Sequence, residues 1–170
     1  MSKAKVATVW LDGCSGCHMS LLDMDETIVA VAQKADLVYG PLVDAQVFPE
    51  GVDVTLVEGA VSSQDDLEKI QLVRSRSRLV VALGDCAITG NVPALRNPVG
   101  VKPILDRVYA GRAPSTGVPP LLLQAVPIHQ VVKVDLHVPG CPPPAALIVS
   151  VLSGLLEGRT PDLNQKVKFG

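Results

Sequence analysis

Aromatic side chains are scarce in this sequence, at 3% of its 170 residues, although hydrophobic residues make up 48%. Valine, leucine and alanine must therefore build the core, which is typical of parallel strands that are buried on both faces. An excess of charge of one sign is also lacking, since the formal net charge is −2 and the pI about 5.9. This balance gives no electrostatic reason to expect nucleic acid as a partner.

Long hydrophobic runs are absent too, and none approaches the roughly 20 residues that a membrane-spanning helix needs. The first residues lead into a short apolar run that stops before Cys14, which is too short for a secretory signal. We therefore expect a cytoplasmic chain that forms one domain over residues 1–170. In that reducing compartment the four cysteines favour metal ligation over two disulfide bridges.

Apolar runs and helix-like segments alternate along the chain. Strands are expected at 5–11, 36–39, 52–57, 79–83 and within 132–138. Helices are expected at 18–34, after the capping residues 62–66, around 104–109 and at 145–156, with other irregular structure in 87–120 and an extended tail at 159–170. The alternation predicts an α/β fold: a doubly wound, mostly parallel, five-stranded sheet of flavodoxin-like type, with helices on both faces and the first strand central.

All four cysteines fall where a predicted strand is followed by a helix. Cys14 and Cys17 follow the first strand, Cys86 follows the fourth and Cys141 the fifth. In an open parallel sheet these turns lie at one edge, at the carboxyl ends of the strands, so the four thiols could converge there. Four thiolates can hold a tetrahedral zinc ion or an iron–sulfur cluster. One close pair and two distant single cysteines favour the cluster, while zinc and unliganded redox thiols stay open as alternatives.

Short motifs surround each cysteine and the end of the third strand. They are Trp10-Leu11, Cys14-Ser15-Gly16-Cys17, Ser20-Leu21-Leu22, Val57-Glu58-Gly59-Ala60-Val61, Gly84-Asp85-Cys86-Ala87 and Pro139-Gly140-Cys141-Pro142-Pro143. Together, over residues 5 to 157, they resemble the small subunit of nickel–iron hydrogenases. Most such subunits continue into a second cysteine-rich domain, and exported ones begin with a twin-arginine signal. Without either feature, the sequence is similar to the short small subunit of cytoplasmic, bidirectional NAD-reducing hydrogenases.

The resemblance implies that Cys14, Cys17, Cys86 and Cys141 bind one proximal 4Fe–4S cluster. It implies that electrons from H2 oxidation at a Ni–Fe centre in a separate large subunit pass through this cluster toward NAD, which diaphorase-type iron–sulfur and flavin subunits reduce. The chain would be one subunit of a hydrogen dehydrogenase, in a hetero-oligomer, and inactive alone. FMN is a further candidate cofactor, although the two cysteines occupy the first loop, where a mononucleotide phosphate would sit.

One position departs from the hydrogenase pattern. Many small subunits carry a glutamate two residues after the second cysteine, placed for proton transfer, whereas here His18 and Met19 follow Cys17. Glu58, at the end of the third strand on the same predicted edge, is the candidate for a proton-transfer or cluster-tuning role. Its alternative role is to cap the following turn. His18 fits a first-turn helix residue better than a group that tunes the cluster.

Other polar and aromatic residues have simpler interpretations. Trp10 either shields the cluster from water or lies in the core, and Asp85 caps the next helix. His129 and His137 are expected to be structural. The three arginines between a helix and a strand are expected to form a solvated helix end that favours the helix dipole, namely Arg74, Arg76 and Arg78.

Two other functions stay open. The first is a complex-I-like, quinone- or ferredoxin-linked oxidoreductase subunit, against which the spacing of Cys14 and Cys17 counts, because that family carries adjacent cysteines in this loop. The second is a zinc-stapled scaffold domain with no catalytic role.

Overall fold

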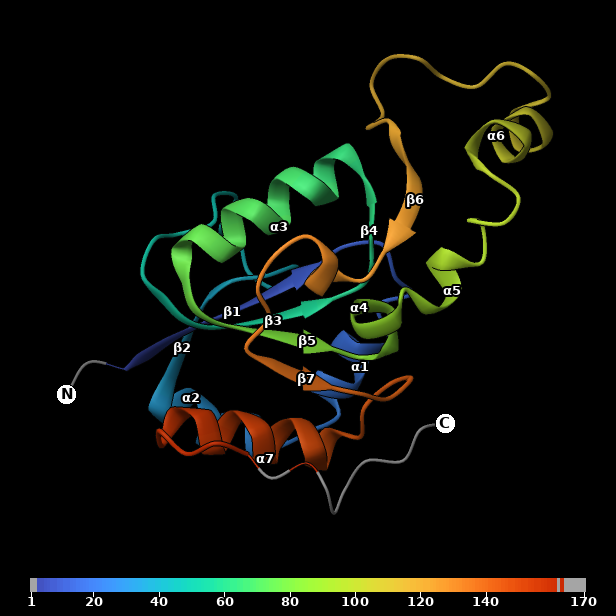
Figure 1. Cartoon of the computed structure of the whole chain (residues 1–170). Helices are drawn as coiled ribbons and strands as arrows, with labels where there is room; N and C mark the ends of the chain where they lie inside the picture. Colours follow the sequence, from blue (N-terminus) through green and yellow to red (C-terminus); the bar gives the residue numbers. More distant parts are fainter. Residues whose placement is uncertain (1–2, 162, 164–170) are drawn as a thin grey trace.

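Five parallel strands form the central sheet of the structure, a computed structural model that describes residues 3–161 and Leu163 (Figure 1). The strands are β1 (Ala4–Trp10), β2 (Ala35–Tyr39), β3 (Val52–Glu58), β5 (Ser77–Leu83) and β7 (Leu136–Val138). Their spatial order is β2-β1-β3-β5-β7, the order of flavodoxin-like sheets. The predicted fold class is therefore confirmed. One detail is wrong, because β3 takes the middle position and β1 lies between β2 and β3.

Helices cover both faces of the sheet (Figure 1). On one face lie α1 (Gly16–Leu22), α2 (Thr27–Lys34) and α7 (Ala145–Leu156); on the other lie α3 (Gln64–Arg76) and α4 (Asp85–Thr89). Alternate residues of each strand face opposite layers, so Val6 packs toward α7 while Ala7 and Val9 pack toward α3. The strands are consequently apolar almost throughout. In the described part of the chain, no helix is both long and apolar enough to cross a bilayer.

The start of α3 shows how local sequence sets an element. Ser63 Oγ accepts a hydrogen bond from the Asp66 N–H at 3.2 Å, and the Asp66 carboxylate accepts one from the Ser63 N–H at 3.0 Å. This reciprocal capping box fixes the helix entry. Ile70 and Val73 then lie fully buried against the sheet. The predicted capping residues are confirmed.

The single helix predicted at 18–34 is wrong. The chain forms α1 and α2 with a turn between them, in which Asp25 has a left-handed φ of 48°. A residue in this conformation cannot continue a right-handed helix. Neither glycine nor proline marks the break, and the helical spacing of apolar residues continues across it, so the sequence pattern predicted one helix.

The segment after Cys86 is more regular than predicted. The helix predicted around 104–109 is confirmed as the longer α6 (Val101–Tyr109), and the segment also holds α4 and α5 (Asn91–Ala94). It also contains an unpredicted strand, β6 (Leu121–Val126), which pairs antiparallel with β4 (Val61–Ser63). In Figure 1, α6 lies well away from the central sheet, beyond β6 and α5.

The predicted strand within 132–138 is shorter than expected. Within this segment only the residues of β7 form a strand, which follows the short 3₁₀ helix η1 (Ile128–Gln130). At the C-terminus, the helix predicted at 145–156 is confirmed as α7, which begins after Pro144. Much of the predicted tail, residues 162 and 164–170, lies outside the described residues.

Candidate functional site

The loops that carry the cysteines lie at the carboxyl edge of the sheet. Cys14 follows β1, Cys86 is the second residue of α4 just after β5, and Cys141 comes three residues after β7. These three side chains line one pocket of about 270 Å³ with Asp12, Gly13, Asn91, Val92 and Pro93. Cys14 and Cys141 are exposed, whereas Cys86 is half-buried. The structure therefore brings together three of the four residues that the sequence singled out, from three distant loops.

Cys17, the fourth cysteine, lies deeper at the same site. Only 8% of it is exposed. Burial raises the pKa of its thiol far above the usual range, and the negative charges of Glu58 and of the other three cysteines raise it further. The Cys17 sulfur therefore lies within electrostatic range of the other three cysteines. Because the protonated thiol is favoured here, a metal that binds Cys17 must displace its proton.

A glycine makes room for this buried sulfur. Gly84, at the end of β5, has a φ of 83° and a ψ of 164°, a conformation that side chains rarely adopt. A Cβ built at Gly84 would overlap the Cys17 Sγ. The glycine therefore lets the backbone of β5 pass close beside the sulfur of the first loop.

Backbone hydrogen bonds fix the first cysteine loop to the end of β3. The Leu11 N–H donates to the Glu58 carbonyl at 2.9 Å, and Asp12 and Ala60 exchange bonds of 3.1 and 2.7 Å. Gly59, with a φ of 95°, allows this approach, since its Cβ would lie 2.8 Å from the Asp12 carbonyl oxygen. The position of Cys14 is thus set by β3 as well as by β1.

Asp85 ties together the loops of Cys86 and Cys141. Its N–H donates to the Gly140 carbonyl at 3.0 Å, and its carboxylate accepts from the Gly140 N–H at 2.8 Å. The prediction that Asp85 caps the next helix is wrong, because its carboxylate reaches across to the neighbouring loop. On the other side, Ser20 Oγ of α1 donates to the Pro143 carbonyl at 2.5 Å. The three cysteine loops are therefore cross-linked by hydrogen bonds.

Glu58 and His18 form a buried pair beside Cys17. The two residues are only 2% and 4% exposed. Glu58 Oε2 accepts from the His18 N–H at 3.0 Å and lies 2.5 Å from His18 Nδ1. Among the described residues, His18 Nε2 is buried with no hydrogen-bond partner. The Glu58 carboxylate thus holds the first turn of α1, which lies 40 residues earlier in the sequence, and does not cap the turn that follows β3.

Three further residues surround the cysteines. Trp10 is 46% exposed and donates to the Gly13 carbonyl at 3.2 Å, so its interpretation as a core residue is wrong. Met19, in the position where many small subunits carry glutamate, is 60% exposed. Asn91, whose amide lies 3.6 Å from Cys141 Sγ, was not among the predicted site residues. Its one signal was its place after Gly90, in the loop that continues from Cys86.

Arg74 and Arg76 lie in the last turn of α3, as the helix-end prediction requires, but their side chains are mostly covered and not solvated. Arg74 lies 2.6 Å from the Asp135 carboxylate and also donates to the carbonyls of Lys133, Ser77 and Arg78. It therefore joins the end of α3 to the segment that leads into β7.

The other two arginines also contact the protein. Arg76 donates to the Phe48 carbonyl at 2.5 Å, while Arg78 makes a more exposed ion pair with Asp53 at 3.4 Å.

His129 and His137 pack edge to face, with ring centroids 5.8 Å apart, and neither lines the cysteine pocket.

The donor set of the pocket suits a metal cluster. Within the described ranges, no three His, Cys, Asp or Glu side chains are grouped closely enough to hold a single metal ion. The thiols are instead distributed around the pocket wall. A cubane cluster takes each thiolate on a different iron atom, so it needs four sulfurs spaced around a volume. Cys14, Cys86 and Cys141 around this pocket, with the buried Cys17 in the same loop as Cys14, fit that requirement.

Comparison with known proteins gives one consistent result. The family model described as NADH ubiquinone oxidoreductase, 20 Kd subunit, matches residues 14–155. The chain is 36% identical to the NAD-reducing hydrogenase HoxS subunit delta of Cupriavidus necator, over 97% of this chain and 84% of that one. It is 39% identical to a subunit of the F420-non-reducing hydrogenase vhu of Methanocaldococcus jannaschii, over 96% of this chain, but it spans only 59% of that relative's length. A chain in the crystal structure of an NAD+-reducing [NiFe]-hydrogenase in the H2-reduced state matches with a TM-score of 0.92 and 37% identity, over 99% of this chain and 100% of that one.

Proposed function

Because the chain belongs to the family of the NADH ubiquinone oxidoreductase 20 kDa subunit and is homologous to a subunit of an NAD-reducing hydrogenase, we propose that it is the electron-transfer small subunit of such an enzyme. In this proposal Cys14, Cys17, Cys86 and Cys141 hold one 4Fe–4S cluster. When bound, the cluster supplies one-electron transfer at a potential set by its protein surroundings.

The observation that supports the proposal is that Cys14, Cys86 and Cys141, from three hydrogen-bonded loops, line one pocket, with Cys17 buried in the first of these loops. Cys17 lies on the buried side and Cys14 and Cys141 on the exposed side. The protein therefore shields one side of the site from water and leaves the other open toward a partner. Since electron transfer between subunits requires close approach, this exposed side is where the redox partner would dock.

The partners follow from the hydrogenase relatives. We propose that a separate large subunit carries the Ni–Fe centre, and that diaphorase-type iron–sulfur and flavin subunits pass the electrons to NAD. The similarity to the HoxS subunit delta and to a chain of an NAD+-reducing [NiFe]-hydrogenase, at 36% and 37% identity, supports NAD as the acceptor. FMN is not part of the proposal, since no feature of the first loop supports it beside Cys14 and Cys17.

Glu58 is proposed to position Cys17 and to tune the cluster. It holds the main-chain N–H of His18, the residue next to Cys17, and also faces the His18 ring. It thus orients the first turn of α1, and its negative charge lies close enough to influence the Cys17 sulfur. Surrounding charges and hydrogen bonds of this kind set metal-site properties.

A second candidate function has its own support. The description of the matching family names a subunit of NADH ubiquinone oxidoreductase. This favours a complex-I-like role, in which the same cluster would deliver electrons to a quinone. The partner that co-purifies with the chain separates the two functions. A nickel-containing subunit supports the hydrogenase role, and a quinone-binding membrane partner without nickel overturns it.

The test is Cys86→Ser in the assembled enzyme. We expect the variant to lose bound iron and H2-dependent NAD reduction while its far-UV circular dichroism stays that of the wild type. Thr89→Ser, in the same short helix α4, is the matched control and keeps both iron and activity. Unchanged iron in Cys86→Ser, or a colourless zinc-loaded wild type, would contradict the cluster. Zinc in the wild-type protein, together with loss of folding in Cys86→Ser, would instead support the scaffold domain.

A further inference from the structure

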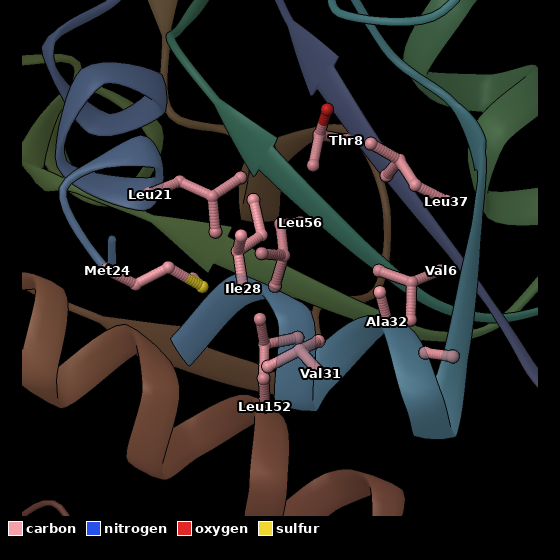
Figure 2. Close-up of a pocket in the computed structure, with 11 residues that line it drawn as sticks. Val6, Thr8, Leu21, Met24, Ile28, Val31, Ala32, Leu37, Leu56 and Leu152 are labelled. Atoms are coloured by element: carbon pink, nitrogen blue, oxygen red, sulfur yellow. The ribbon is translucent and has the colours of Figure 1, made fainter. Parts of the chain in front are cut away.

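Two pockets of the chain differ in what their walls can donate. The pocket under α2 is lined by apolar side chains, among them Val6, Leu56 and Leu152, and the Thr8 hydroxyl points away from them (Figure 2). The cysteine pocket shares no residue with it, and its lining includes Asn91. A side-chain amide has two N–H groups, so it can donate to two acceptors at once.

The Asn91 amide reaches the sulfurs of two cysteine loops. Its Nδ2 donates to Cys141 Sγ at 3.6 Å. Burial raises the pKa of the Cys86 thiol, whereas hydrogen bonds from the Val92 main-chain N–H and from the Asn91 side chain lower it. One side chain thus contacts a sulfur of the second cysteine loop and a sulfur of the third.

The backbone holds Asn91 in a conformation that few residues adopt. Its φ is 32°, in the left-handed region, which asparagine tolerates better than most other residues. The Asn91 N–H donates to Thr89 Oγ1 at 3.3 Å, and the Thr89 hydroxyl donates to the Asp85 carbonyl at 2.8 Å. Asn91 is therefore tied to α4, the helix that carries Cys86. Strained residues of this kind collect at functional sites, where the surrounding structure holds them in place.

Negative groups dominate the wall of the cysteine pocket. The described residues that line it include Asp12 and three cysteines, and none of them is lysine, arginine or histidine. Cysteine binds metals as the thiolate, so reduction adds an electron to a site that is already negative. The N–H dipoles of Asn91 and Val92 are aimed at these sulfurs, and hydrogen bonds to the sulfurs help to set the potential of an iron–sulfur cluster.

We propose that Asn91 is a positioning residue that donates to the sulfurs of Cys86 and Cys141 and thereby raises the reduction potential of the site. This inference rests on the proposed function, because it needs a 4Fe–4S cluster on the four cysteines. An N–H group that points at a thiolate stabilises the reduced state more than the oxidised one, since the reduced state carries one more negative charge. The same two bonds hold the loops of Cys86 and Cys141 in register.

An EPR redox titration of the anaerobically purified holoenzyme tests this role. Asn91→Gly removes the amide and suits a left-handed backbone, so the iron content should be retained. We expect its reduction equilibrium to shift about tenfold toward the oxidised state, which is about 59 mV for a one-electron couple. Asn91→Asp replaces the donor by a charged acceptor and should shift the equilibrium further.

Ala94→Gly is the matched control. It loosens the backbone of the same helix, α5, but removes no hydrogen-bond donor, so the potential should stay that of the wild type. A potential that falls in Asn91→Asp alone would reflect charge and not the hydrogen bonds, and would overturn the proposal. Equal shifts in Asn91→Gly and Ala94→Gly would also overturn it.

Pulsed EPR reads the contact itself, even where Asn91→Gly does not retain iron. In reduced wild-type enzyme labelled with ¹⁵N-asparagine, we expect a weak ¹⁵N hyperfine coupling that Asn91→Gly lacks. A wild type without this coupling, or a coupling that persists in Asn91→Gly, refutes the role of Asn91. A wild type without a four-iron cluster would instead refute the proposed function, so the two failures are distinguishable.

Discussion

Gly84→Ala tests whether the backbone beside Cys17 sets the geometry of the cysteine site. Gly84 has a φ of 83° and a ψ of 164°, where residues other than glycine cost about 1–3 kcal/mol. The new Cβ would also overlap the Cys17 Sγ, and forced overpacking adds about 1–3 kcal/mol. We therefore expect Gly84→Ala to lower the free energy of unfolding by about 2–6 kcal/mol and to displace the sulfur.

Gly51→Ala is the matched control. Gly51 also has a positive φ, 68°, but its Cβ would meet no atom within 4 Å. This variant should lose only the backbone contribution, about 1 kcal/mol, and keep its bound iron. The difference between the two variants isolates the contact with Cys17.

Two assays report on the pair. Urea unfolding of the full-length chain gives the free energies, and iron analysis of anaerobically purified protein gives the occupancy of the site. We expect Gly84→Ala to contain less than half of the iron that Gly51→Ala contains. Equal iron and equal stability in the two variants would refute the idea that Gly84 is needed to make room for Cys17.

Three other substitutions give separate predictions. Glu58→Gln should raise the reduction potential of the cluster in an EPR redox titration, because it removes a negative charge beside Cys17; an unchanged potential would contradict the tuning role. Ser63→Ala should cost about 1 kcal/mol in urea unfolding by removing the N-cap of α3, while Ser75→Ala in the same helix should cost less than half as much. Burial raises the pKa of Asp135, but a main-chain N–H of β5 and the Arg74 guanidinium lower it more, so the pKa in the folded chain lies below its ordinary value. Asp135→Asn should therefore cost about 0.5–1 kcal/mol at pH 7, since the pair is partly solvated, and the difference from wild type should begin to shrink near the ordinary Asp pKa of about 4 and disappear only below the lower pKa of the folded chain; a difference that does not shrink between about pH 5 and pH 2 would contradict the ion pair.

The order of the sheet could be predicted because its strands are buried on both faces. Such strands appear as continuous apolar runs, and short turns between runs and helices leave few topologies open. The same logic placed Cys14, Cys17, Cys86 and Cys141 at one edge, since every turn that follows a parallel strand reaches that edge. These conclusions needed only the positions of the residues along the chain.

What the sequence did not reveal depends on contacts or on unusual backbone conformations. The break between α1 and α2 rests on Asp25, whose left-handed φ of 48° has no glycine or proline to announce it. Strand β6 was not predicted because most of its residues are exposed, with Leu123 87% accessible. Its sequence therefore lacks the alternation of apolar and polar residues that is typical of a half-buried strand.

The polar contacts of the site were hidden for another reason. Glu58 meets His18 across 40 residues, and Asp85 meets Gly140 across 55. No local pattern encodes such pairs, because the folded sheet brings them together.

Anomalous diffraction at the iron absorption edge, from crystals of the anaerobically purified enzyme, tests the central claim most directly. We expect four iron peaks in the pocket lined by Cys14, Cys86 and Cys141, with the Cys17 sulfur bound to the fourth iron from the buried side. A single metal peak, or any of the four sulfurs bound away from the shared cluster, would contradict it.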